Sequence, residues 1–137
     1  MDVQYAPQKL QLASRPESIN QVEKLVDEIR EEYKISEDCY GKILISMTEA
    51  VTNAIAHGNK SDPSKMVDIT YHFDHDKINF TVTDQGPGFD YYNLPDPTAP
   101  ENLEKPCGRG IYLMKHLSDQ LIFNNNGSSI ELTFYTN

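Results

Sequence analysis

The sequence predicts an α+β fold, a two-layer sandwich in which helices cover one face of a mixed, mostly antiparallel sheet. Two pairs of short segments alternate between apolar and polar residues, and each pair surrounds a tight turn. Apolar residues elsewhere recur at helical spacing. The chain has 137 residues, which suits a single core, so we expect residues 1–137 to form one domain.

The N-terminal half is expected to hold one strand and two helices. Residues 8–13 alternate weakly and predict a short strand. Apolar residues recur at helical spacing over residues 16–33, and the proline at the start is compatible with the first turn of a helix. A second helix is expected to run from a cap at Ser36 to about His57, with Gly58 as its C-terminal stop.

The C-terminal half is expected to hold two hairpins with a helix between them. Residues 66–74 and 77–83 alternate at period two across a two-residue gap, which predicts an antiparallel hairpin. A short helix is expected to follow Gly110. The last two strands flank Asn126 and Gly127, a pair that strongly favours a hairpin turn.

A proline-rich loop is predicted between the hairpins. Four of the eight prolines fall between Tyr91 and Cys107, where apolar periodicity is weak. Loops longer than about 12–15 residues are uncommon inside compact domains and usually serve as lids or binding loops. We therefore expect a functional loop here.

Composition limits the classes of partner. The chain carries 12 basic and 21 acidic residues, a net charge of −9, which argues against a general binder of nucleic acid or anionic membranes. No apolar run approaches the ~20 residues of a membrane span, and the N-terminus does not resemble a signal peptide. Two cysteines are too few for a disulfide scaffold or a structural zinc site. We expect a cytoplasmic protein.

The predicted second helix carries polar side chains along one stripe. Glu49, Asn53 and His57 are spaced four residues apart and so lie on one side of a helix. Glu49 is a candidate general base, and Asn53 offers an oxygen of the kind that Mg²⁺ takes. A solvated polar face has the same spacing, so the stripe alone is compatible with both interpretations.

A glycine-containing segment follows the predicted strand that ends at residue 83. Asp84 is a candidate acceptor for a hydrogen bond from an amino group, such as the exocyclic amine of adenine. Gly86 and Gly88 allow a sharp turn and a close approach to a ligand. Plain turns also contain D-x-G, so this segment too has two interpretations.

A second glycine segment stands at the predicted start of the third helix. Gly108 and Gly110 place backbone N–H groups where they can face an anion. Lys105, Arg109 and Lys115 surround them with no acid between, so an acidic protein concentrates positive charge here. The spacing matches neither a Walker A loop nor a dinucleotide fingerprint. The segment is a candidate polyphosphate site, and simple solvation of the two lysines is the alternative.

The order of these motifs resembles a known family. E-x-x-x-N on a helix, D-x-G-x-G after a strand, a long loop and then G-x-G resemble the ATP-binding domain shared by histidine kinases, type II DNA topoisomerases, mismatch-repair ATPases and a large chaperone family. The segments TEAVTNAIAHGN, DQGPGFD and GRGIYLMKHLSD are most similar to the bacterial anti-sigma-factor serine/threonine kinases. The resemblance covers nearly the whole chain and implies the histidine-kinase-like ATPase fold.

The resemblance implies a role for each matching position. Glu49 matches the catalytic carboxylate, Asn53 the Mg²⁺ ligand and Asp84 the adenine-binding aspartate. Residues 91–107 match the lid over the nucleotide. Further nucleotide contacts are implied for His57, Gly86, Gly88, Phe89, Gly108, Arg109, Gly110, Ile111 and Ser128.

The function implied by the resemblance is phosphorylation of a serine or threonine on a small partner, with Mg-ATP as the donor. In that family the partner is a STAS-type anti-sigma-factor antagonist, the kinase also sequesters a sigma factor, and a homodimer is expected. We find no upstream helix with a phospho-accepting histidine and no transducer domain, so a complete two-component kinase, a topoisomerase and a mismatch-repair protein are not expected.

Three alternatives remain at this point. The alternatives to the kinase are a non-catalytic ATP-binding switch that sequesters a partner, an interaction domain without nucleotide, and a detached ATPase domain acting on a separate histidine protein. Glu49 favours catalysis because a carboxylate there is not needed merely to hold adenine.

Overall fold

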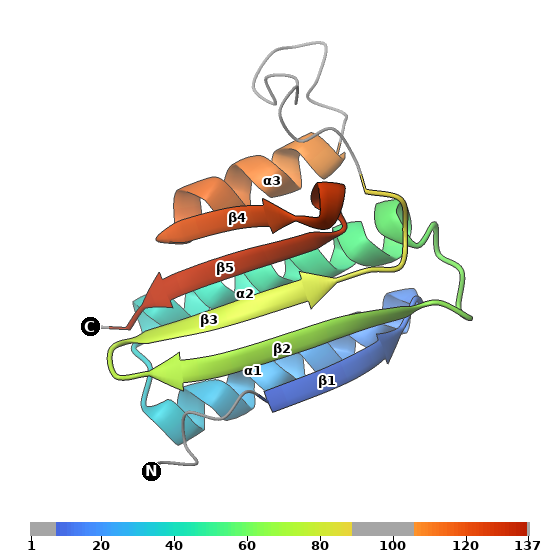
Figure 1. Cartoon of the computed structure of the whole chain (residues 1–137). Helices are drawn as coiled ribbons and strands as arrows, with labels where there is room; N and C mark the ends of the chain where they lie inside the picture. The colour runs from blue at the N-terminus through green and yellow to red at the C-terminus, as the bar shows by residue number, and fades with distance from the viewer. Residues whose placement is uncertain (1–7, 89–105, 137) are drawn as a thin grey trace.

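The computed structural model describes residues 8–88 and 106–136, and its elements follow the predicted order (Figure 1). The strands are β1 (Gln8–Ala13), β2 (Met66–Asp74), β3 (Lys77–Thr83), β4 (Gln120–Asn124) and β5 (Ser129–Tyr135). The helices are α1 (Ile19–Tyr33), α2 (Glu37–Asn53) and α3 (Pro106–Leu117).

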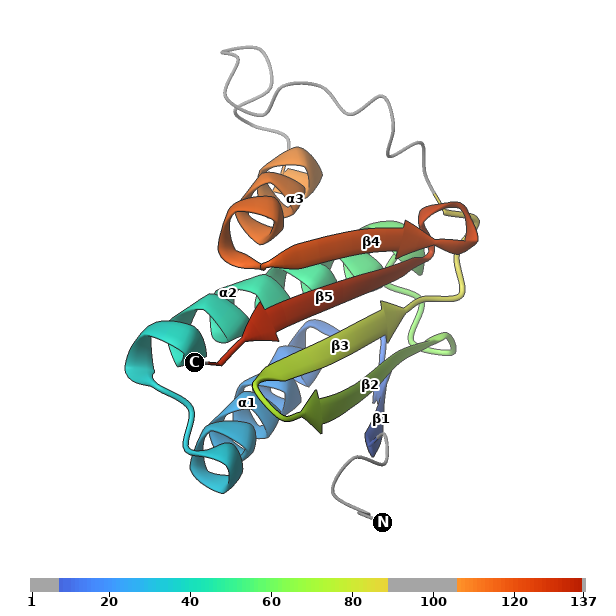
Figure 2. The ribbon, with the colours of Figure 1, turned by 60° about the vertical axis from the view of Figure 1, so that its left-hand side comes forward.

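The five strands form one sheet in the order β1-β2-β3-β5-β4. All four pairings are antiparallel, so in the described residues the sheet is antiparallel throughout rather than mixed. The α1 and α2 helices cover one face of this sheet, while α3 lies beside α2 at the β4 end (Figures 1 and 2). The predicted two-layer α+β sandwich is confirmed.

The core lies between the sheet and the helices. Its largest aromatic pair is Phe80 with Phe134, whose rings meet edge to face with centroids 6.1 Å apart, a favoured aromatic geometry. Met47 and Val51 are fully buried on α2. The sheet contributes the buried alternating side chains of Val67, Ile69, Ile78, Phe80, Val82, Ile130, Leu132 and Phe134.

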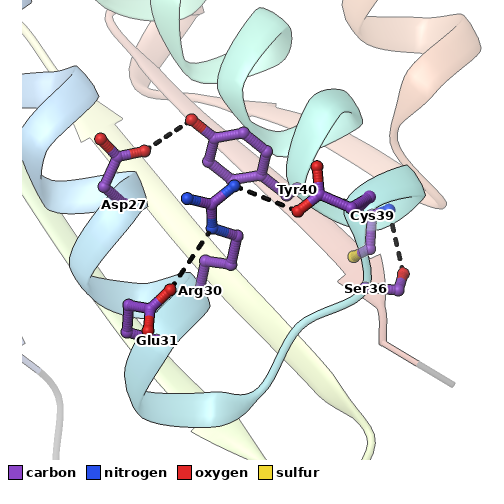
Figure 3. A network of polar contacts seen from close by, with 7 residues as sticks. Asp27, Arg30, Glu31, Ser36, Cys39 and Tyr40 are labelled. Carbon is purple, nitrogen blue, oxygen red and sulfur yellow. Dashed lines mark hydrogen bonds and ion pairs between the residues drawn. The ribbon is translucent and has the colours of Figure 1, made fainter.

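The α2 helix begins at the predicted cap, because the Ser36 hydroxyl accepts a hydrogen bond from the Cys39 N–H at 3.2 Å. A set of partly exposed polar contacts joins this end of α2 to α1 (Figure 3). We call Asp27, Arg30, Glu31, Glu37 and Tyr40 the corner network.

The corner network centres on Arg30 and Tyr40. The Arg30 guanidinium lies 4.1 Å from the centre of the Tyr40 ring, and its Nη1 is 3.2 Å from Glu37 Oε1. The Tyr40 hydroxyl donates to Asp27 Oδ1 at 2.5 Å, which raises the pKa of the tyrosine. The Glu31 and Glu37 side chains are 80% and 85% exposed, so water screens these ion pairs.

The other end of α2 differs from the predicted glycine stop. A π turn, Ala54–Gly58, follows the helix, and the Asn59 N–H donates to its first carbonyl at 2.8 Å. The left-handed residues come later, at Lys60 and Ser61 (φ 53° and 57°). Gly58 has no positive φ, so a different contact requires a glycine there.

The third helix and the two hairpins also test the predictions. Both hairpins form, with Asp74 opposite Lys77 in the first pair and Asn124 opposite Ser129 in the second. The helix begins at Pro106, earlier than the predicted start after Gly110. Proline is well suited to a first helical turn, and glycine inside this helix allows a close contact with α2.

Candidate functional site

A cavity of about 140 Å³ opens between the C-terminal end of α2, helix α3 and the adjoining ends of β3 and β5. Its wall is mostly apolar, as is typical of small-molecule sites. Six of the residues singled out from the sequence line it: Asn53, His57, Asp84, Gly88, Ile111 and Ser128. The remaining lining residues are Ala50, Ala54, Gly58, Val82, Met114, Phe123, Gly127 and Ile130.

Asp84 is the acidic residue of this wall. Its N–H donates to the Ser128 carbonyl at 2.9 Å, and its Oδ1 accepts the Gly86 N–H at 2.8 Å. Burial raises the pKa of Asp84, and the Gly86 hydrogen bond partly offsets that effect. A partly desolvated carboxylate is stabilised by a ligand that donates a hydrogen bond to it.

Two positions beside Asp84 require glycine because neighbouring atoms leave no room for a Cβ. A Cβ on Gly58 would lie 2.3 Å from Asp84 Oδ2, and a Cβ on Gly86 would lie 2.0 Å from the Gly58 carbonyl oxygen. Gly88 is required for another reason, a φ of 85°. The glycines therefore let two backbone segments, the exit of α2 and the turn after β3, meet around one carboxylate.

Asn53 faces the cavity from α2. Its Nδ2 is buried and has no hydrogen-bond partner among the described residues. Buried polar atoms are normally paired, so this unpaired amide indicates a site for a ligand. The amide can turn its oxygen or its nitrogen toward that ligand, because the two orientations are assigned from the hydrogen bonds.

Glu49 lies one turn before Asn53 and is not part of the cavity wall. A Cβ on Gly110 would lie 2.7 Å from Glu49 Oε1 and 3.0 Å from Asn53 Nδ2. Gly110 thus brings α3 against the polar stripe of α2. The stripe and the second glycine segment, separate in the sequence, meet in the fold.

The second glycine segment lies inside α3 rather than in a loop before it. In a helix that begins at Pro106, the N–H group of Gly108 belongs to the first turn, where N–H groups have no acceptor within the helix and can face an anion. The close approach to α2 gives Gly110 a packing role, and the nucleotide contact implied for it stays a prediction. Arg109 is exposed on this turn.

The donor set fits a magnesium ion held mainly by a nucleotide. In residues 8–88 and 106–136 no three His, Cys, Asp or Glu side chains form a metal-binding group. Mg²⁺ commonly takes one or two protein oxygens and completes its shell with water and phosphates, a role that the Asn53 amide suits.

Some predicted features lie outside the described residues. They are Phe89, Lys105 and the predicted lid over residues 91–107, except for its last two residues, which begin α3. Within the part of the chain that the structure describes, no helix is both long enough and apolar enough to cross a membrane.

Sequence reasoning missed Asn59, a fully buried residue whose side chain bonds the turn that carries Asp84. The signal was weak because Asn59 follows the polar stripe of α2 but is out of phase with it. A polar residue between a glycine and a lysine also resembles an ordinary loop residue.

Comparison with known proteins identifies the class. The model of the histidine kinase-like ATPase domain matches residues 12–134, so the chain belongs to the histidine kinase-like ATPase domain family. ATP is the ligand that membership of this family implies.

The similar curated proteins are named more specifically than the domain family. The serine-protein kinase RsbW of Listeria innocua is 25% identical over 135 residues, which cover 93% of this chain and 86% of that protein. The RsbW proteins of Bacillus cereus and Staphylococcus aureus are 31% and 30% identical over 66% of this chain, and the matches span 61% and 62% of their length.

A solved structure shares the fold. The crystal structure of the RsbU and RsbW domains of a Mycobacterium tuberculosis protein superimposes with a TM-score of 0.65 at 16% identity. The match covers 94% of this chain and 32% of that one. The matching domain family and the kinase relatives confirm the predicted resemblance to the bacterial anti-sigma-factor serine/threonine kinases.

Proposed function

We propose that this chain is an anti-sigma-factor kinase that uses Mg-ATP to phosphorylate a serine or threonine of a STAS-type antagonist and that also sequesters a sigma factor. The observation that carries the proposal is the Asp84 carboxylate, partly desolvated in an apolar cavity beside the unpaired Asn53 amide. The names of the relatives support the kinase activity.

Adenine occupies the apolar cavity in this proposal. Val82, Met114 and Ile130 supply apolar walls for the purine, and Asp84 accepts a hydrogen bond from the exocyclic amine. The Asp84 N–H is bonded to the Ser128 carbonyl, and the Asp84 carboxylate accepts the Gly86 N–H. These two hydrogen bonds keep the direction of the carboxylate without a ligand. Preorganisation of this kind lowers the entropic cost of binding.

The phosphates extend toward the contact between α2 and α3. Asn53 would hold Mg²⁺, which would offset the negative charge of the phosphates. Glu49 accepts the proton of the attacking hydroxyl. Arg109 and the first-turn N–H groups of α3 orient the phosphate chain.

The test is transfer of the γ-phosphate from labelled ATP to a purified antagonist. The wild type should label a serine or threonine, and Glu49→Gln should reduce the rate by about 100-fold, because general base catalysis typically contributes at least that much. Glu23→Gln is the matched control, since Glu23 is exposed on α1 and outside the cavity wall. An acid-labile product would instead indicate transfer to histidine.

A second candidate is an ATP-binding switch that sequesters a partner without phosphorylating it. The observation in its favour is that Glu49 lies outside the cavity wall and against the Gly110 position of α3. It predicts nucleotide-dependent partner binding in pull-downs and no label on any antagonist. Wild-type protein that binds ATP but never transfers phosphate would replace the kinase proposal with this one.

The homodimer and the cytoplasmic location belong to the same proposal. Light scattering of the purified chain with and without Mg-ATP tests the assembly. A mass of 15.6 kDa identifies a monomer, and twice that mass a dimer.

A further inference from the structure

A polar cluster centred on a buried asparagine lies directly behind Asp84, outside the cavity wall. It consists of Ser14, Asn59, Met66 and Gln85, and we call it the asparagine clamp. The Asn59 side chain is 0% exposed. Its Nδ2 donates to Ser14 Oγ at 2.9 Å and to the Met66 carbonyl at 3.0 Å, while its Oδ1 accepts the Gln85 N–H at 2.7 Å.

The clamp closes into a ring. The Met66 N–H donates to the Gln85 side-chain oxygen at 2.7 Å, so Asn59, Met66 and Gln85 are each bonded to the other two. The Ser14 hydroxyl extends the ring by donating to the Lys65 carbonyl at 2.7 Å. A single asparagine thus joins the end of β1, the exit of α2, the start of β2 and the turn after β3.

The backbone adopts unusual conformations where it delivers Asn59 to this position. The π turn Ala54–Gly58 immediately precedes Asn59, and Lys60 and Ser61 then take left-handed conformations. Such conformations are unfavourable for residues with a side chain and persist where the surrounding contacts compensate for them. The hydrogen bonds of Asn59 supply that compensation.

The clamp fixes the backbone next to Asp84. Gln85 N–H is bonded to Asn59 Oδ1, and the Asp84 N–H is bonded to the Ser128 carbonyl. The two consecutive amides are therefore held by different segments of the chain. These two anchors fix the backbone from which the Asp84 side chain projects, and the Gly86 N–H that donates to Asp84 Oδ1 restrains the carboxylate itself.

We propose that Asn59 is a positioning residue for Asp84, which aims the carboxylate at the amino group of the base and so determines the preference for adenine. The inference rests on the proposed function, because it assigns adenine to the cavity. A purely structural clamp would stabilise the fold without affecting which base is bound.

The experiment compares two nucleotides that differ only in the amino group. Mg-ATP and the Mg complex of purine riboside 5′-triphosphate, which has hydrogen at C6, are titrated calorimetrically into the wild type and Asn59→Ala. Asn79→Ala is the matched control, because its Nδ2 donates to Thr133 Oγ1 at 2.9 Å in the sheet, away from Asp84. Circular dichroism confirms that each variant is folded at the temperature used.

The expected result is a change in the ratio of the two dissociation constants. The wild type should prefer ATP by about tenfold, since a hydrogen bond to a charged acceptor is worth at least that factor. Asn59→Ala should bring the ratio close to 1, and Asn79→Ala should keep the wild-type ratio. A folded Asn59→Ala that retains the ratio, whatever its absolute affinity, overturns the positioning role.

A second variant keeps the test decisive if Asn59→Ala does not fold. Gln85 is exposed, so Gln85→Ala removes one bond of the ring with little loss of packing, and it should lower the ratio by a smaller factor. An unchanged ratio in folded Gln85→Ala then overturns the inference. A wild type that binds both nucleotides equally would instead contradict the proposed role of Asp84 itself, and a wild type that binds neither would contradict the nucleotide site.

Discussion

The two ends of α2 carry polar networks of opposite character. The corner network at the N-terminal end consists mainly of charged, partly exposed side chains, whereas the asparagine clamp beyond the C-terminal end is neutral and centred on the fully buried Asn59 side chain. Exposed ion pairs contribute little to stability, because water solvates the two charges almost as well as they solvate each other. A fully buried side chain whose hydrogen bonds are all paired, such as that of Asn59, fixes one geometry, because no water can replace a lost partner. The Asp84 carboxylate lies beside the second kind of network.

The largest expected effect is from Gly86→Ala. Its Cβ would lie 2.0 Å from the Gly58 carbonyl oxygen, so the backbone around Asp84 must move. We expect a loss of about 3 kcal/mol in the free energy of unfolding, as for severe overpacking, together with loss of ATP binding. Urea denaturation and calorimetry measure the two.

Gly41→Ala is the matched control for that variant. Gly41 lies in α2 near the corner network, and a Cβ there meets no atom within 4 Å. Replacement should therefore stabilise the fold by about 0.5–1 kcal/mol through helix propensity alone. Similar losses in both variants would contradict the claim that crowding is confined to the Asp84 end.

The second largest effect is expected for Asn59→Ala, in the free energy of unfolding. Replacement by alanine removes three hydrogen bonds of a fully buried side chain, so we expect a loss of about 3 kcal/mol. Asn79→Ala, which loses one part-buried bond, should cost about 1 kcal/mol. The midpoint of urea unfolding compares them, and equal losses would remove the distinction between the clamp and an ordinary hydrogen bond.

The third effect concerns pH and Asp84. Burial raises the pKa of its carboxyl above the ordinary 3.8, so the folded chain holds the proton more tightly than the unfolded chain. The resulting stability is fully present below pH 3.8 and is lost as the pH rises through the raised value. At pH 7 the apo form of Asp84→Asn should therefore be more stable than the wild type, and the difference should shrink in acid.

Urea unfolding at several pH values checks this expectation. Asp76→Asn, in the exposed turn between β2 and β3, is the control and should change stability little. If Asp84→Asn were less stable than the wild type at pH 7 without nucleotide, the carboxylate would be stabilising the fold rather than serving a ligand.

The smallest effect is expected in the corner network. Arg30→Lys keeps the charge but loses the planar stacking on Tyr40, and its free energy of unfolding should fall by less than about 1 kcal/mol. Because salt screens the ion pair with Glu37, 0.5 M salt should reduce the effect further. A loss as large as that of Asn59→Ala would show that the two networks are equivalent after all.

The order and type of the elements could be predicted because both depend on local periodicity. Alternation in β2 and β3 predicts which of their side chains are buried, and the cap at Ser36 follows from its hydroxyl. The cavity residues Asn53, Asp84 and Ser128 were also identified, since motif order carried them. Their roles toward ATP stay predictions.

The errors have a tertiary origin. The end of α2 and the start of α3 depend on how closely the two helices and the Asp84 turn approach one another, which no local pattern reports. Gly58 and Gly110 were interpreted as a stop and a loop residue, but both are required by contacts with distant carboxylates. Asn59 was missed because its three partners lie far from it in sequence or beyond a turn.

The most direct test of the account is calorimetric titration of Mg-ATP into the wild type and Asp84→Asn, with unfolding curves to confirm that both are folded. The account predicts saturable one-site binding by the wild type, stabilised by about 2.7 kcal/mol at about 100 times Kd, and no measurable binding by the variant. Binding of ATP to folded Asp84→Asn with wild-type affinity would contradict the assignment of this cavity to adenine.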